Sequence, residues 1–311
     1  MEKRDHIDTF GAVALTLFAL FLAFNQVVIK VTNGGLQPVF FAGLRSAGAV
    51  LCVWLWLILR GRDWRLRRPQ LVAGLVTGTI FALEFLCLFV ALDLTTVARA
   101  SVIFYSMPVW MTLGAHLLLP GDGITRGKAL GLTLAMGGVA LALLTRPSDG
   151  TGSVWGDLAA LGAAVGWAAS GLSCKVTALK DVRPEMQLQW QLVVSAPILL
   201  LLAPLFGPLV RDLEPIHLWG LAFQIVLVVS AGFIFWLWLL SLYPASGVAS
   251  FSFLSPLFAV FLGWALLGEE VSLTLLGALA LVAIGLLLIN RPPQVPQKVR
   301  VTASSSDGGR R

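Results

Sequence analysis

The sequence predicts an all-α membrane protein with ten transmembrane helices, arranged as an inverted repeat of two five-helix units. The first observation is composition, because 58% of the 311 residues are hydrophobic and only 12% are charged, against about 45–50% and about 25% in soluble domains. The second is that the apolar residues form runs of about twenty, enough for a helix to cross about 30 Å of hydrocarbon. The third is that the second half of the chain resembles the first.

Each predicted helix is an apolar run, and the connections between the runs are short. These connections leave no room for a soluble catalytic domain. The sequence after the last run is rich in Pro, Ser and Arg, which is typical of a disordered tail. The predicted helices cover residues 9–31, 38–59, 70–92, 98–119, 128–145, 156–179, 186–206, 216–240, 247–267 and 273–290.

The repeat is visible as residues that recur in the same order in each half. Lys30-Val31-Thr32 corresponds to Lys175-Val176-Thr177, and Pro108 corresponds to Pro256. Because each unit crosses the membrane an odd number of times, the second unit must enter from the opposite side. Such an inverted repeat is typical of secondary carriers. The predicted units are residues 1–146 and 147–292, followed by a cytoplasmic tail over residues 293–311.

The distribution of positive charge predicts how the chain is oriented. Sixteen Lys and Arg residues fall on the side of the N-terminus, whereas Arg99, Arg146 and Arg211 fall on the opposite side. Lys and Arg are enriched in the cytoplasmic loops of membrane proteins. We therefore expect a multi-pass protein of the bacterial inner membrane with both termini in the cytoplasm.

The predicted helix over residues 98–119 carries a polar stripe. Ser101, Tyr105, Pro108, Thr112 and His116 are spaced by three or four residues, so they share one helix face. The stripe is either a seam whose hydroxyls bond neighbouring helices or the wall of a cavity. Pro108 leaves one backbone carbonyl without its helical partner, which favours a cavity wall.

The corresponding helix in the second half presents smaller residues on one side. Ser252, Ser255, Pro256, Ala259 and Gly263 either allow close packing or leave open space. A further stripe, which we expect to bond neighbouring helices, consists of Gln187, Gln191 and Ser195, while Gln224 stands alone in the next helix.

Two opposite charges fall inside the predicted helices at similar depth. Glu84 and Arg45 each lie about 10–12 Å below the outer surface, counted at the helical rise of 1.5 Å per residue. A carboxylate in hydrocarbon is costly enough to suggest a function. One hypothesis is a structural ion pair with Arg45, and the other is that Glu84 binds a substrate amine or couples transport to protons.

Matching polar residues also occupy the first helix of each unit. Asn25 and Lys30 correspond to Ser170 and Lys175. The lysines are near helix ends and either extend to the lipid headgroups or contribute to gating, whereas Asn25 and Ser170 lie nearer the midplane. Trp167, one turn from Ser170, either packs against lipid or stacks on a substrate.

The sequence offers no pattern for a cofactor, a metal or a nucleotide. The cysteines fall inside apolar runs, the histidines fall in different segments, and the phosphate-binding pattern GxxxxGK[ST] is absent. ATP is therefore not expected to drive the protein directly, and we expect neither an enzyme nor a nucleic-acid partner. The residues concerned are Cys52, Cys87, Cys174, His6, His116 and His217.

A set of residues in a fixed order carries a family resemblance over about Gly11 to Pro292. The chain resembles the drug/metabolite transporter superfamily, in the branch made of two EamA-type units, and within it the YddG-like exporters of aromatic amino acids. In place of the acidic pair that the family pattern expects after the fourth helix, the first unit has Pro120-Gly121-Asp122-Gly123. The residues that carry the resemblance are Asn25, Lys30, Pro38, Arg45, Pro108, Trp167, Lys175, Pro184, Ser255-Pro256 and Gly268-Glu269-Glu270.

The resemblance implies a carrier that exports aromatic and other neutral amino acids by alternating access around a central cavity. A multidrug or lipophilic cation exporter of the same fold is the main alternative, since Glu84 permits a cationic substrate. Nucleotide sugars would need more cations, and a membrane enzyme would need clustered Asp, His or Glu. The predicted substrate-binding residues are Asn25, Glu84, Ser101, Tyr105, Thr112, Trp167, Ser170 and Ser252, and the predicted structural or gating residues are Lys30, Arg45, Lys175, Pro108 and Pro256.

Overall fold

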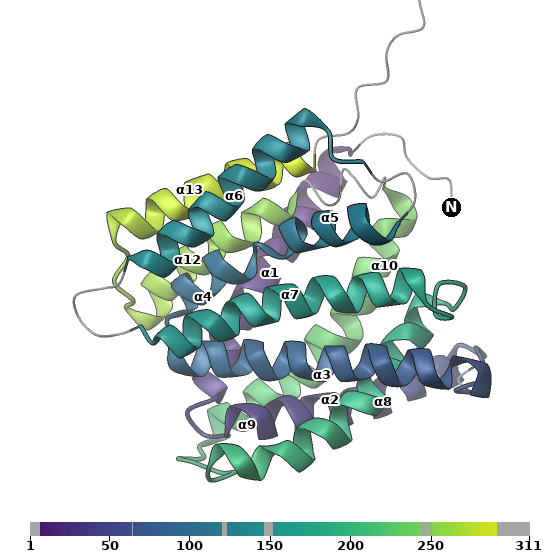
Figure 1. The fold of residues 1–311 in the computed structure, drawn as a ribbon. Helices are drawn as coiled ribbons and strands as arrows, with labels where there is room; N and C mark the ends of the chain where they lie inside the picture. Colours follow the sequence, from purple (N-terminus) through teal and green to yellow (C-terminus); the bar gives the residue numbers. More distant parts are fainter. Residues whose placement is uncertain are drawn as a thin grey trace, which may run out of the picture.

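The described part of the chain is a bundle of helices (Figure 1). The computed structural model describes residues 7–63, 65–119, 123–145, 152–243, 248 and 251–290. Within these ranges the only β-type pairing is an isolated bridge between Leu36 and Val210, so the all-α prediction is confirmed. The long helices are α1 (Thr9–Thr32), α2 (Pro38–Leu59), α3 (Leu71–Leu94), α6 (Arg126–Leu144), α7 (Val154–Val176), α8 (Pro184–Leu202) and α13 (Leu273–Ile289).

Three predicted helices are built from shorter pieces. The prediction over 98–119 corresponds to α4 (Val97–Phe104) and α5 (Met107–Leu118), and that over 216–240 to α9 (Pro215–Ala222), the π-helix η3 (Phe223–Gly232) and α10 (Phe233–Leu242). The prediction over 247–267 is described from the 3-10 turn η4 (Phe251–Phe253) onward, and continues as α12 (Leu254–Leu267).

The break between α4 and α5 has a local cause. A proline ring clashes with the carbonyl four residues earlier, and for Pro108 that residue is Phe104, where α4 ends. Tyr105 and Ser106 form the turn between the two pieces. The prediction of one continuous helix over 98–119 is therefore corrected to two helical pieces joined by a turn, which together still form one span of 22 residues.

Eight of the helical segments are long and apolar enough to cross a membrane, and two more, Phe251–Leu267 and Leu273–Ile289, are apolar but shorter. Large apolar side chains also cover the outside of the bundle, as at Leu59 (76% exposed), Leu144 (84%) and Leu273 (86%). In water such a surface would aggregate. The chain is therefore a multi-pass membrane protein.

Helix starts are fixed by polar caps that accept the first free backbone N–H groups. Asp8 accepts from Gly11 at the start of α1, and Gln37 accepts from Phe40 at the start of α2. Thr96, Thr125 and Ser272 have the same role at α4, α6 and α13.

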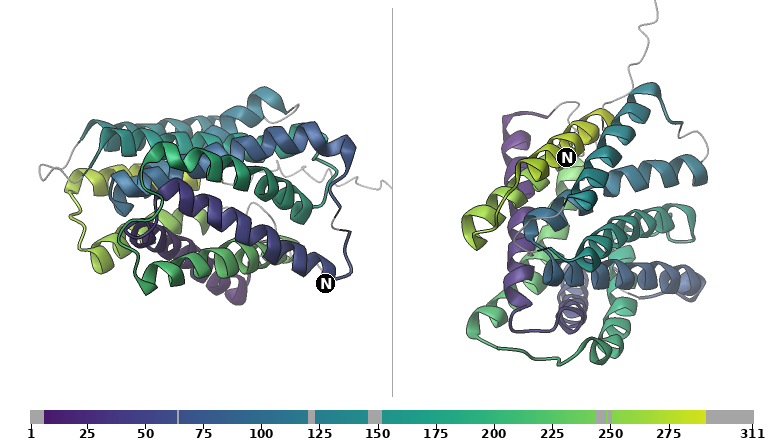
Figure 2. Two further views of the ribbon diagram at one scale, coloured as in Figure 1. Left: turned by 90° about the horizontal axis from the view of Figure 1, so that it is seen from below. Right: turned by 60° about the vertical axis from the view of Figure 1, so that its left-hand side comes forward.

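Helices from the two halves of the chain pack against one another. The most extensive contacts join α6 to α13, α3 to α7, α2 to α8, α3 to α8 and α1 to α12. Figures 1 and 2 show α6 beside α13 along their length. Gly131 makes the α6–α13 contact possible, because a Cβ atom there would meet the carbonyl oxygen of Gly285 at 2.7 Å. Each half therefore buries its apolar faces largely against the other half.

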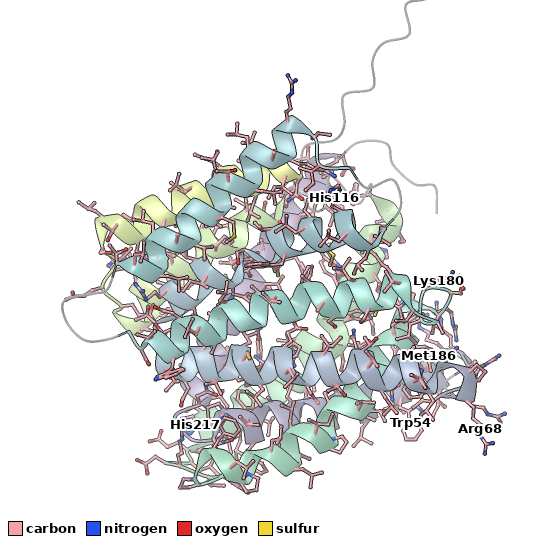
Figure 3. All side chains as sticks on the ribbon, viewed as in Figure 1. Trp54, Arg68, His116, Lys180, Met186 and His217 are labelled. Atoms are coloured by element: carbon pink, nitrogen blue, oxygen red, sulfur yellow. The ribbon has the colours of Figure 1, made fainter. Side chains whose placement is uncertain are left out.

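The charged residues gather at the two ends of the bundle. One end, which we call the Asp63 end, includes the α2–α3 and α7–α8 connections, with Arg68 and Lys180 (Figure 3). The opposite end, the Asp93 end, includes the α1–α2, α3–α4 and α8–α9 connections and His217. Polar side chains that lie between these ends are the candidates for a transport function.

Candidate functional site

Arg45 is a buried cation in the middle of α2. The residue is only 5% exposed, and its Nε and Nη1 atoms have no hydrogen-bond partner among the residues that the structure describes. The guanidinium carbon lies 4.0 Å from the ring centroid of Phe85 and 5.7 Å from that of Phe89. These cation–π contacts compensate part of the lost hydration, but they leave two strong donors unsatisfied.

Glu84 lies on α3, next to the α7 contact. It is 3% exposed and interacts electrostatically with Arg45, yet within the described residues no ion pair joins the two side chains. A Cβ atom on Gly166 of α7 would lie 3.0 Å from the Cα atom of Glu84, so α7 passes directly over this carboxylate. The structure thus brings the two predicted charges together without direct contact.

Aromatic rings surround this pair of charges. Phe85 is 4.6 Å from Phe81 and 6.0 Å from Phe89, and Phe89 is 5.0 Å from Phe41, as measured between ring centroids. The rings provide apolar walls of low dielectric, in which electrostatic interactions are strong. We call Arg45, Glu84, Phe81, Phe85 and Phe89 the Arg45 cluster.

A first polar network joins three helices and contains two of the predicted site residues. Ser101 donates to the amide oxygen of Gln26 at 2.6 Å, and Tyr105 is hydrogen-bonded to Gln26 and Ser255. All four side chains are at most 4% exposed. In this conformation the stripe of α4 is therefore a buried seam with α1 and α12.

A second network joins α7 to α8 and α3. Gln191 of α8 donates its Nε2 hydrogen to Ser170 of α7 at 3.1 Å. Ser173, one turn along, donates to the hydroxyl of Thr77 on α3 at 2.9 Å. The expectation that Gln191 bonds a neighbouring helix is confirmed, and Ser170 is a buried, hydrogen-bonded side chain of α7.

Asn25 bonds across the two halves of the chain. Gln224, which is fully buried on η3, donates to the side-chain oxygen of Asn25. Within the described part of the chain, the amide oxygen of Gln224 has no hydrogen-bond partner. A π-helix is a local deviation that is often found at functional sites, and here it holds the polar partner of Asn25.

The remaining predicted binding residues lie apart from these groups. Thr112 donates to the carbonyl of Pro108 in its own helix at 2.7 Å, and Trp167 is 38% exposed on α7. Ser252 is partly buried in η4, beside the start of α12 that contains Pro256. Lys175 is exposed near the end of α7.

The Asp93 end contains a buried ion pair that sequence reasoning missed. Arg99 donates from Nε to both carboxylate oxygens of Asp157, at 2.9 and 3.0 Å, and from Nη2 at 2.7 Å. Its other donors reach the backbone carbonyls of Thr145 and Ala142. The pair connects α4 to α7 and leaves no guanidinium nitrogen without a partner.

Two more side chains at this end, Glu269 and Lys30, bond the backbone near the start of α4. Glu269 accepts the backbone N–H groups of Val97 and Ala98 at 2.6 and 2.9 Å, and so caps α4 from the loop after α12. Burial raises the pKa of Glu269, although these N–H groups and the charge of Lys30 act in the opposite direction. Lys30 itself donates to the carbonyl of Thr95 at 2.8 Å and is therefore engaged with protein rather than lipid headgroups.

Arg211 links the α8–α9 connection to α3. It pairs with Asp93 at 2.7 Å and donates to the carbonyl of Asn33 at 3.0 Å. Its backbone N–H also bonds the carbonyl of Gly35 beside the Leu36 bridge. Connections from both halves are thus tied together at the Asp93 end.

The Asp63 end has its own ion pairs. Arg62 is paired with Glu185 of α8, and Arg67 is paired with Asp63 at 2.7 Å. The hydrogen bond from Arg67 lowers the pKa of Asp63. Arg183 donates to the carbonyl of Asp63 at 2.9 Å, so contacts across the halves are present at this end as well.

An apolar groove of about 460 Å³ lies between α1, η3 and α10. It is open at the surface, and a lipophilic molecule is the kind of ligand that it suits. Its lining includes Phe10, Leu17, Phe18, Phe21, Leu227 and Phe235. No group of three His, Cys, Asp or Glu side chains that could hold a metal lies within the described ranges.

Several of these residues were not singled out from the sequence as site residues. Gln26 is one position from Asn25, and its burial depends on the rotation of α1. Asp157 and Arg99 did carry a signal, because charges within the first turns of apolar helices require a partner. The turn over Pro120-Gly121-Asp122-Gly123 lies mostly outside the described residues.

Comparison with known proteins agrees with this architecture. The chain is similar to the uncharacterized transporter YoaV of Bacillus subtilis, at 22% identity over 89% of this chain and 94% of the relative. It is also similar to the uncharacterized transporter YvbV of the same organism, at 28% identity over 90% and 91%. A solved crystal structure shares the fold with a TM-score of 0.64 and 20% identity, covering 88% of this chain and 95% of that one.

The model of the EamA-like transporter family matches the chain twice, over residues 9–144 and 154–291. These two matches correspond to the two halves whose helices pack against each other. Together they cover most of the chain, and the relatives are named as transporters. The chain therefore belongs to the EamA-like transporter family and is a membrane transporter.

Proposed function

We propose that this protein is a secondary carrier for aromatic and other neutral amino acids, with ten transmembrane helices in two inverted units. The observation that carries the proposal is the exchange symmetry of the helix contacts. In the repeat, α7 is the counterpart of α1, and α9 with η3 is the counterpart of α3. The contact between α3 and α7 should therefore have a matching contact between α1 and the pair α9 and η3, and both contacts occur.

Other contacts obey the same exchange. Because α12 is the counterpart of α4 and α5, the contact of α1 with α12 matches the contact of α7 with α4 and α5, which also occurs. The helices α2 and α8 are counterparts of each other and are in contact, and the same holds for α6 and α13. Two units related in this way have two conformations of similar energy, one open to each side of the membrane. Alternating access then follows from rocking one unit against the other.

The placement of charges supports an orientation with the Asp63 end in the cytoplasm. The Asp93 end includes Arg99 and Arg211. By contrast, the Asp63 end includes a larger group of cations, among them Arg60, Arg65 and Arg68. An excess of Lys and Arg in short loops is typical of the cytoplasmic face.

The amino-acid cargo is supported by the chemistry of the membrane interior. The Arg45 cluster contains both signs of charge beside several phenylalanine rings. A small zwitterion with an apolar side chain matches that combination. The lipophilic cation alternative is favoured by Glu84 and by the aromatic groove along α1.

The proposal is tested by counterflow in proteoliposomes. Vesicles loaded with one unlabelled amino acid are mixed with a trace of the labelled form, with and without a pH gradient. We expect accumulation of labelled phenylalanine, tyrosine or tryptophan over empty-vesicle controls. Exchange of a lipophilic cation such as tetraphenylphosphonium, with no exchange of any amino acid, would show that the alternative is right.

A further inference from the structure

We infer that the Arg45 cluster is the binding site for the charged head of the solute, with Arg45 binding the carboxylate and Glu84 binding the ammonium group. The inference rests on the proposed amino-acid carrier and deepens it. It assigns the solute class as α-amino acids, that is, small molecules that carry both charges on adjacent atoms.

The first step concerns the donors of Arg45. A buried guanidinium normally has its N–H groups satisfied, because an unpaired polar group inside a protein is strongly unfavourable. Among the described residues, Nε and Nη1 of Arg45 have no hydrogen-bond partner, although the residue is only 5% exposed. A carboxylate binds a guanidinium through Nε and Nη2 or through Nη1 and Nη2, and each of these two edges of Arg45 includes one of the unbonded nitrogens.

The second step is a comparison within the same protein. Arg99 is equally buried, and all its guanidinium nitrogens bond Asp157 or backbone carbonyls. The fold can therefore satisfy a buried arginine fully where the role is structural. At Arg45 the opposite charge, Glu84, is near but forms no ion pair with it, so both groups keep binding capacity.

The third step uses the repeat. Gln191 occupies the position in α8 that corresponds to Arg45 in α2, and it donates to Ser170 at 3.1 Å. The second half thus has a neutral side chain with a bonded partner where the first half has a charge. Recognition of the charged head is accordingly confined to the first half, between α2 and α3.

The final step concerns which solutes the cluster excludes. A phosphate or sulfate ester would face Glu84 with only one cation beside it, and a lipophilic cation would face Arg45. An amino acid offers a carboxylate and an ammonium group a few ångströms apart, and the rings of Phe81, Phe85 and Phe89 contact an apolar side chain. Both charges are buried in this conformation, so binding requires the movement of the two units.

The inference is tested by competition in counterflow with labelled L-phenylalanine. The competitors are L-phenylalanine, phenethylamine, which lacks the carboxylate, and 3-phenylpropionate, which lacks the amine. In the wild type we expect each analogue to compete about 10- to 100-fold more weakly than L-phenylalanine, because each leaves one buried charge without its partner. This comparison of competitors uses the wild-type protein alone.

Two variants assign the residues. Arg45→Gln should make L-phenylalanine as weak as phenethylamine, and Glu84→Gln should make it as weak as 3-phenylpropionate. Arg45→Lys keeps the charge but loses the paired donors, so part of the affinity should return. Arg126→Gln, an exposed change on α6, is the matched control and should behave as wild type.

Two outcomes would overturn the inference: equal competition by all three compounds in the wild type, or unchanged discrimination in Arg45→Gln. In either case exchange of labelled phenylalanine by the wild type would still support the proposed carrier. Failure of all amino-acid exchange would instead overturn the proposed function. Thermal unfolding of each purified variant establishes that it is folded, and Arg45→Lys serves if Arg45→Gln is not.

Discussion

Arg99 and Arg45 are both buried arginines, but their surroundings differ in a way that separates structure from function. Arg99 donates to Asp157 and to two backbone carbonyls at the Asp93 end. Arg45 lies over Phe85 with two nitrogens unbonded. A charge that the fold surrounds with partners holds helices together, whereas a charge left without partners is available to a ligand. Mutations of residues that hold helices together should therefore have the largest effects on stability.

The largest effect on stability is expected for the Arg99 pair. Arg99→Gln or Asp157→Asn leaves one buried charge without its partner, and each should destabilise the protein by about 3–5 kcal/mol. Replacing both residues with apolar ones should recover part of that loss. Thermal unfolding in detergent measures the effect, and a loss under 1 kcal/mol, on the order of a surface pair, would contradict the structural role.

The next effect concerns Ser170, a buried residue of α7. It is 4% exposed and bonded to Gln191 of α8, so Ser170→Trp should overpack its surroundings at a cost of about 1–3 kcal/mol. The exposed Lys175→Trp is the control in the same helix. Normal stability of Ser170→Trp together with lost transport would show instead that Ser170 faces a wet cavity.

Removal of the hydroxyl group of Tyr105 should have a smaller effect on stability. Tyr105→Phe deletes the hydroxyl from the network with Gln26 and Ser255, which should cost about 0.5–1.5 kcal/mol. Tyr243→Phe, which deletes a 2.7 Å bond to Asp8, is the matched control at the Asp63 end. Counterflow rates of the two variants are then compared. If Tyr105 also contacts the solute, Tyr105→Phe should transport more slowly than Tyr243→Phe.

The smallest effect is a pH dependence at Glu269. Burial raises the pKa of this carboxyl group. At a pH just above the ordinary pKa of a glutamate, the folded protein therefore still holds a proton that the unfolded chain has released. Stability should therefore fall as the pH rises through this window. Glu269→Gln should remove this slope, which unfolding midpoints across the pH range would show. An unchanged slope in Glu269→Gln would assign it to another group.

The helices could be predicted because their signal is local. Hydropathy located the apolar segments to within a few residues, although it did not predict the turn between α4 and α5. The rotation of each helix could not be predicted, because helices such as α7 are apolar on most faces. Trp167 was assigned to the site because it lies deep in the span and one turn from Ser170, and in the structure it is 38% exposed.

Partners far apart in the sequence were also beyond prediction. Arg99 and Asp157 meet only because α4 and α7 pack side by side, and Gln26 meets Ser101 only through the packing of α1. The similar depths of Arg45 and Glu84 did predict that the two charges are neighbours. Their lack of direct contact depends on side-chain placement, which depth does not determine.

The most direct test of the contrast between Arg99 and Arg45 is the shift in unfolding temperature that saturating L-phenylalanine causes. A ligand that binds only the folded state raises this temperature. We predict that Arg45→Gln unfolds near the wild-type temperature without ligand and shows no shift, whereas Arg99→Gln unfolds at a lower temperature and keeps the full shift. A wild-type shift in Arg45→Gln, or loss of the shift only in Arg99→Gln, would contradict the separation of a structural from a binding arginine.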